Sequence, residues 1–149
     1  MRHCRFIGAL PLLAAAMIAG AAAQESNLAS DNLSHSKVFA FDNLPVRKMA
    51  NGGESRDVVE GAVATGETVS IHESVQPAGA PPNPAHRIEH SEFILVQEGT
   101  LEFMHDGKTE RAGAGSVIYV AHGTMHGVRN VGDGPAKYTV FSLGGDAGK

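Results

Sequence analysis

The sequence predicts an all-β domain, either a small barrel or a double-sheet jelly roll, and three observations lead to this class. Eight or nine short segments with the alternation or apolar character of strands follow one another along the chain. Turn signals separate nearly all of them, and the 149 residues include 18 glycines and seven prolines. Long segments with the periodicity of a helix are scarce. Many short, evenly spaced strands are typical of closed or two-layered antiparallel folds.

Taken in order, the expected strands are bounded by polar, glycine or proline turns. The strongest hairpin signal is Asp106-Gly107, because a two-residue turn requires positive backbone angles that Asp and Gly tolerate. Gly113 to Gly115 and Gly132 to Pro135 mark two further reversals. The strands are expected at residues 37–41, 55–63, 67–75, 92–97, 100–105, 108–112, 116–120, 127–130 and 136–143.

The first 23 residues resemble a bacterial secretory signal peptide. Arg2 and Arg5 form a basic start, residues 6–20 are apolar, and three alanines precede Gln24. A membrane anchor is the alternative, but Gly and Pro interrupt the apolar run. We therefore expect a signal peptide at 1–23, a flexible arm at 24–34 and one domain at 35–145, exported to the periplasm or secreted.

Composition narrows the classes of partner. The chain has 16 acidic and 12 basic residues, a net charge of -4, and neither a basic stripe nor a series of aromatic residues. Nucleic acid is therefore a poor candidate partner, and no membrane contact is expected once the signal is removed. Since the only cysteine, Cys4, lies within the predicted signal, any metal ligands of the mature chain are expected to be His, Asp or Glu.

Two short polar segments predict a metal site. His86, His90 and Glu92 precede one apolar strand, and His126 and Asn130 follow another. Imidazole and carboxylate ligands from neighbouring strands suit Fe²⁺ or Mn²⁺, and also Zn²⁺, Ni²⁺ or Cu²⁺. A small-molecule substrate or ligand is the expected partner.

These segments resemble the two signatures of the cupin superfamily. The first is matched by Gly79, His86, Glu92 and Gly99, and the second by Gly115, Gly123, His126 and Asn130, with Ala121 where proline is usual. The resemblance implies a single-domain cupin, a double-stranded β-helix of the jelly-roll type. It also implies that His86, Glu92 and His126 are metal ligands.

One position departs from the cupin pattern. Ile88 stands where the second histidine of the first signature is expected. Three alternatives follow: a three-ligand site, a four-ligand site completed by His90, or a cupin without metal. The resemblance implies a metal-dependent enzyme, with dioxygenase chemistry first and isomerase or lyase chemistry next. A non-catalytic protein that binds a small ligand or a metal is the alternative.

Other residues receive simpler predictions. We expect His72 on the surface rather than in a pocket, and Arg56 and Arg129 as the candidate anion anchors, each more typical of a surface residue. The resemblance also implies a homodimer, in which the segment 37–41 could pair at a sheet edge.

Overall fold

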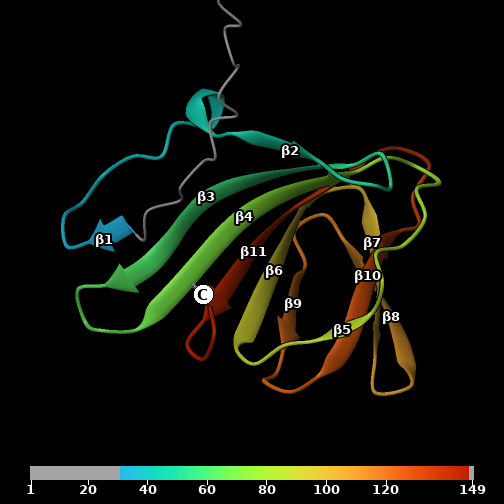
Figure 1. Cartoon of the computed structure of the whole chain (residues 1–149). Coiled ribbons are helices and arrows are strands. Elements are labelled where there is room, and N and C mark those ends of the chain that lie inside the picture. The colour runs from blue at the N-terminus through green and yellow to red at the C-terminus, as the bar shows by residue number, and fades with distance from the viewer. Residues whose placement is uncertain (1–30, 148–149) are drawn as a thin grey trace, which may run out of the picture.

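The computed structural model describes residues 31–147, so the predicted signal peptide and residues 24–30 of the predicted arm lie outside the described part. Two β-sheets face each other within this part (Figure 1), and the only helical element described is a short 3-10 helix, η1 (Phe41–Asn43). The prediction of an all-β jelly roll is confirmed.

The larger sheet has seven strands in the order β1-β3-β4-β11-β6-β9, with β2 also paired to β3. All its pairings are antiparallel except that of β1 with β3. The neighbours β4, β11 and β6 are far apart in sequence, which is typical of a jelly roll. Its strands are β1 (Asp31–Leu33), β2 (Val46–Lys48), β3 (Glu54–Val63), β4 (Thr68–Gln76), β6 (Ser91–Glu98), β9 (Val117–Val120) and β11 (Ala136–Leu143).

The smaller sheet has four strands in the order β5-β10-β7-β8. They are β5 (His86–Arg87), β7 (Thr100–His105), β8 (Lys108–Gly113) and β10 (Met125–Asn130). The β7–β8 hairpin turns at Asp106 and Gly107, whose φ angles are 45° and 72°. This is the two-residue turn that the sequence predicts.

The core lies between the two sheets. Alternate residues of β6 are buried, and Ile94 and Val96 point inwards together with Val120 of β9 and Val140 of β11. Leu101 and Phe103 of β7 close the core from the smaller sheet. The period-two burial follows from side chains that alternate across a strand.

The N-terminal part differs from the prediction. Residues 37–41 were expected to form a strand, but the chain there is irregular and enters η1, and Val38 is 90% exposed. β1 and β2 pair with the two ends of β3 along that edge, and residues 37–41 lie in the connection between these two strands. β1 also shows that residues 31–33, placed in the flexible arm by sequence, belong to a sheet.

Candidate functional site

Glu92 lies on the inner face of β6, one residue into the strand. It sits opposite Ser142 of β11 and Val120 of β9, and only 7% of it is exposed. A carboxylate buried in this way needs hydrogen bonds or an opposite charge to offset its lost hydration. The side chains that contact Glu92 are therefore the candidate residues of the site.

His126 reaches the same region from the smaller sheet. It is paired with His86 of β5 and with His105 of β7, and it is 3% exposed. Its Nδ1 lies 3.3 Å from the backbone oxygen of Thr124. A carbonyl oxygen can only accept, so Nδ1 is the nitrogen that donates, and Nε2 is directed towards Glu92.

Glu92 and His126 face each other across the junction of the two sheets. Oε2 of Glu92 lies 3.5 Å from Nε2 of His126, and the ring centroids of His126 and His86 are 4.7 Å apart. An unprotonated nitrogen and a carboxylate oxygen both present lone pairs, which repel each other. Either a proton on Nε2 or a cation between the two atoms would make this contact favourable.

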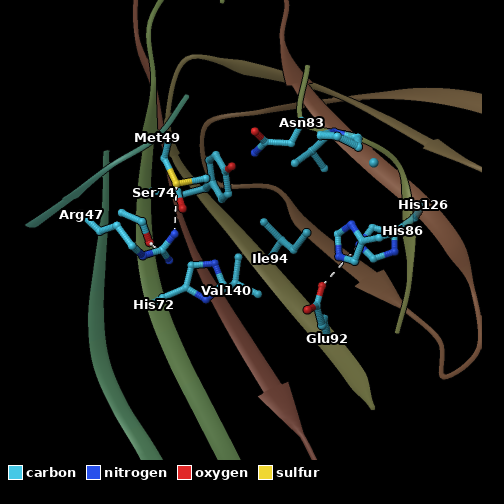
Figure 2. A pocket seen from close by; sticks show the side chains of 15 residues that line it. Arg47, Met49, His72, Ser74, Asn83, His86, Glu92, Ile94, His126 and Val140 are labelled. Carbon is cyan, nitrogen blue, oxygen red and sulfur yellow. Dashed lines mark hydrogen bonds and ion pairs between the residues drawn. The ribbon is translucent and has the colours of Figure 1, made fainter. Parts of the chain in front are cut away.

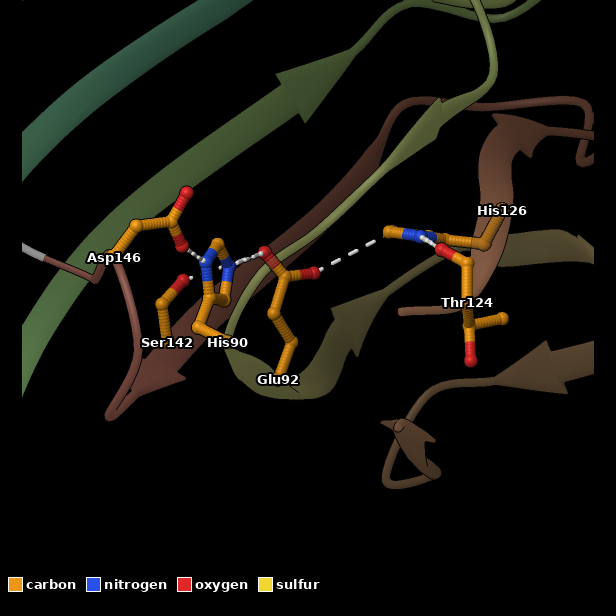
Figure 3. A network of polar contacts seen from close by, with 6 residues as sticks. All are labelled: His90, Glu92, Thr124, His126, Ser142 and Asp146. Carbon is orange, nitrogen blue, oxygen red and sulfur yellow. Dashed lines mark hydrogen bonds and ion pairs between the residues drawn. The ribbon is translucent and has the colours of Figure 1, made fainter. Parts of the chain in front are cut away.

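The second oxygen of Glu92 is held from the opposite side (Figure 3). Oε1 lies 2.9 Å from Nε2 of His90 and accepts a hydrogen bond from Oγ of Ser142 at 3.3 Å. Nδ1 of His90 lies 2.6 Å from Asp146, which follows the last strand. Both ring nitrogens of His90 thus face carboxylates, so His90 lies behind Glu92 and not at the wall of the cavity.

These contacts shift the pKa values of both groups. Burial alone would raise the pKa of Glu92, but hydrogen bonds from His126 and His90 lower it to about 2. Burial would lower the pKa of His90, but its hydrogen bonds to Glu92 and Asp146 raise it. Glu92 is therefore ionised at neutral pH.

A cavity of about 150 Å³ adjoins this cluster (Figure 2). His86, Glu92 and His126 lie on one side of it, and Arg47 and His72 lie on the other. Ile94 lies between them, and the lining also includes the apolar side chains of Val128 and Val140. The cavity thus has two polar ends separated by an apolar wall.

Several of these side chains lie where the sequence did not lead us to expect them. His72, expected on the surface, lines the cavity, and burial lowers its pKa. Arg47 was not anticipated as a cavity residue. Arg56 contacts Phe41 and Glu54 and lines a different hollow, and Arg129 pairs with Glu102. No local pattern marks Arg47, because its position depends on how β2 pairs with β3.

Ile88 does not line the cavity. It is 4% exposed and packs in the hydrophobic core, directly after β5. The position at which the cupin pattern expects a histidine is thus occupied by a core residue.

Asn130 acts structurally. Its side chain donates to the backbone oxygens of Gln76 and Gly134 and accepts from the backbone nitrogen of Gly132. These bonds join β10 to β4 and shape the turn before β11. The asparagine of the second cupin signature thus has a structural role in this protein.

A divalent metal requires nitrogen and oxygen donors that converge on one point. Among residues 31–147, no three His, Cys, Asp or Glu side chains converge into a complete metal-binding group. The facing pair of Glu92 and His126 nevertheless fits a cation, because Nε2 in its unprotonated form and Oε2 would both direct lone pairs into the space between them. His86, at the exposed rim beside His126, supplies a third donor of the right type. The chemistry of the residues fits a divalent metal.

Comparison with known proteins supports the fold. A family model described as a cupin domain matches residues 71–142, and no curated protein matches the sequence. KdgF from Halomonas sp. is 19% identical, with a TM-score of 0.61, and the match covers 72% of this chain and 94% of that one. A predicted oxalate decarboxylase from Thermotoga maritima is 18% identical, with a TM-score of 0.59 and coverage of 72% and 98%.

A further similar structure is the polyketide cyclase RemF from Streptomyces resistomycificus. It is 17% identical, with a TM-score of 0.61, and the match covers 73% of this chain and 80% of that one. Within residues 31–147, no helix is long and apolar enough to cross a membrane. The matching family model, the two-sheet topology and these similar structures agree that residues 71–142 form a cupin domain within a jelly-roll fold.

Proposed function

We propose that this protein is a metal-dependent cupin enzyme that acts on a small organic molecule. His86, Glu92 and His126 would hold the metal, iron(II) or manganese(II) in the first place. The observation that carries the proposal is the 3.5 Å approach of Glu92 to Nε2 of His126, whose other nitrogen is directed at a carbonyl oxygen. A divalent cation at this point would replace repulsion between lone pairs by coordination.

The metal, when bound, supplies a Lewis acid that polarises substrate oxygens, and iron(II) or manganese(II) also supplies redox chemistry with dioxygen. The chain's own residues orient and shield the substrate. Ile94, Val128 and Val140 exclude water from one wall of the cavity. His90 and Ser142 hold Oε1 of Glu92, which leaves Oε2 directed at the cavity.

Dioxygenase-type chemistry is the first proposal for the reaction, and isomerase or lyase chemistry is the next. The similar structures named above include a predicted decarboxylase and a cyclase, which supports an enzyme but favours no single reaction.

A second candidate is a cupin that binds a small ligand or metal without catalysis. The buried Ile88 favours it, because the usual fourth ligand position belongs to the core. If such a protein holds no metal, His126 carries a proton on Nε2 and forms an ion pair with Glu92.

Elemental analysis of the purified protein tests the metal site on which the proposed enzyme depends. We expect close to one iron or manganese per chain after reconstitution, and its loss in His126→Ala. The matched control is His122→Ala, because His122 lies in the neighbouring loop, is exposed and pairs with Glu89. No bound metal after reconstitution, or equal metal in both variants, would contradict the metal site.

Export and a homodimer are also proposed, from the signal-like segment 1–23 and the cupin resemblance respectively. The segment 37–41 no longer supports dimerisation as an edge strand, since it is not a strand. N-terminal sequencing of the protein from a bacterial periplasmic extract tests the cleavage, and light scattering of the purified protein tests the dimer. A monomeric mass would exclude the dimer.

A further inference from the structure

We propose that the cavity binds a small carboxylate, which Arg47 and His72 hold at the end opposite His86, Glu92 and His126. This inference rests on the proposed function and names the class of molecule that the same cavity takes. The pairing of β2 with β3 brings Arg47 to this end of the cavity, and no local sequence pattern indicated that pairing.

The register of the larger sheet places Arg47 at the cavity. Arg47 on β2 is opposite Ser55 on β3, and Ser55 is opposite Ser74 on β4. All three line the cavity, so they form one inward-facing row across three strands. The next inward row contains Asp57 and His72. The β2–β3–β4 end of the sheet therefore presents polar groups where β6 and β11 present Ile94 and Val140.

Arg47 keeps much of its hydrogen-bonding capacity. Its guanidinium lies 3.4 Å from Oγ of Ser55, 3.3 Å from the sulfur of Met49 and 3.7 Å from a carboxylate oxygen of Asp57. The two contacts to oxygen are long, the thioether sulfur of Met49 is a weak acceptor, and none is the paired, two-bond contact that an arginine makes with a carboxylate. Its side chain is 59% exposed. A ligand carboxylate could therefore bind the guanidinium without displacing a strong partner.

His72 completes this end of the cavity. Burial lowers the pKa of His72, and the charge of Arg47 acts in the same direction, against the opposing effects of Glu92 and Asp57. A neutral imidazole offers one donor and one acceptor. It can donate to a carboxylate oxygen while Arg47 supplies the positive charge. Figure 2 shows the two side chains on the same side of the cavity.

The size and polarity of the cavity limit the rest of the molecule. A volume of 150 Å³ holds about five water molecules, well below a cavity for a drug-sized ligand. Its lining includes the apolar side chains of Ile94, Val128 and Val140, which suit a short carbon skeleton. A second oxygen-bearing group would reach the His86–Glu92–His126 end. The class is thus a short carboxylate with a second oxygen function.

Calorimetric titration with malonate and malonamide tests the assignment. The two probes have the same skeleton, but only malonate is charged. We expect malonate to bind more tightly than malonamide, and Arg47→Gln to raise the Kd for malonate about tenfold or more, as the loss of a charge-assisted contact predicts. Arg47→Lys should recover part of the affinity, because it keeps the charge but not the planar fork.

The matched control is Lys48→Gln. Lys48 is the next residue of β2, does not line the cavity and pairs with Glu54, so the substitution removes one positive charge from the same strand. We expect it to leave the Kd for malonate within about twofold, the scatter expected for an exposed charge. Equal Kd values for Arg47→Gln and Lys48→Gln, equal binding of the two probes, or no malonate binding at millimolar concentration would overturn the proposal.

The titrations are run with metal-free protein and with protein supplied with Mn²⁺. A failure of the proposed metal site can then be distinguished from a failure of the proposed carboxylate site. Arg47→Gln should bind Mn²⁺ as the unchanged protein does. If Mn²⁺ fails to bind, the proposed metal site fails. Malonate binding that depends on Arg47 in the metal-free protein would still support the carboxylate site.

Discussion

At Glu92, two histidines act on one carboxylate from opposite sides. His90 and Ser142 contact Oε1, and His126 faces Oε2. These contacts allow an ionised group to lie in the interior, where an unpaired charge would be costly. The carboxylate is held in place before any ligand arrives, and this favours a binding role over a purely structural one.

The low pKa of Glu92 predicts a loss of stability in acid. Because its pKa is about 2 in the folded protein and ordinarily 4.5, the unfolded chain binds the proton more readily. The stabilisation from ionised Glu92, on the order of 3 kcal/mol, is present above pH 4.5 and is lost as the pH falls towards 2. In denaturant unfolding of metal-free protein, the unchanged protein should therefore have a higher free energy of unfolding than Glu92→Gln near pH 7. This difference should shrink as the pH falls from 4.5 towards 2.

Glu98→Gln controls for the removal of one carboxylate from the same strand, since Glu98 lies at the surface and pairs with Lys137. The free energies of unfolding of the original protein and Glu92→Gln are compared at pH 7 and pH 3. If their difference is the same at both pH values, Glu92 is not held as an ion.

Ile88→His tests whether the missing cupin ligand can be restored. Ile88 is a core residue, so an unpaired imidazole there should lower the free energy of unfolding by about 1–3 kcal/mol. If the new side chain reaches the metal, Mn²⁺ should recover part of this loss by binding the folded state alone. Unfolding with and without Mn²⁺ measures both effects, and Ile88→Gln is the control for a polar residue with weaker metal affinity. Equal recovery in both variants would show that position 88 cannot reach the metal.

At the scale of elements, the turn after β11 positions His90. Asp146 contacts Nδ1 of His90. Gly145 lies so close to the segment before β6 that an added Cβ would meet the backbone oxygen of Glu89 at 1.8 Å. Gly145 also has a positive φ of 54°. The C-terminal turn therefore supports Glu92 indirectly, through His90.

Gly145→Ala should displace this turn and weaken metal binding. Gly144→Ala is a matched control, because Gly144 also has a positive φ, 68°, but an added Cβ would meet nothing within 4 Å. Both variants carry the backbone cost of about 1 kcal/mol, and only Gly145→Ala also breaks the contact of Asp146 with His90. We expect a higher Kd for Mn²⁺ in Gly145→Ala than in Gly144→Ala, and equal values would argue against a supporting role for the turn.

The elements that could be predicted from sequence are those with several alternating residues. The core strands and the Asp106-Gly107 hairpin follow local patterns, whereas the approach of His86, Glu92 and His126 was expected from their resemblance to the cupin signatures. β1, β2 and β5 have two or three residues each, too few for a period to be visible. The cavity positions of Arg47 and His72, and the contact between His90 and Asp146, depend on pairing or packing between distant segments. No window of sequence contains that information.

At the scale of the whole molecule, the candidate metal ligands come from both sheets. Glu92 belongs to the seven-stranded sheet, whereas His86 and His126 belong to the four-stranded sheet. A metal bound by all three would cross-link the two layers of the fold. Such a link would stabilise the native state, because the ligands are brought together only in the folded chain.

This arrangement predicts which parts of the protein a metal should protect. β5 has two residues and pairs only with β10 among the described strands, so its amides should exchange readily in the metal-free protein. At a Mn²⁺ concentration 100 times the Kd, the free energy of unfolding should rise by about 2.7 kcal/mol. Hydrogen exchange should slow most in β5 and at the start of β10. In His126→Ala both effects should vanish, and in His122→Ala both should persist. Stabilisation by Mn²⁺ without slower exchange in β5 would show that His86 does not join the other two ligands, and would reduce the site to Glu92 and His126.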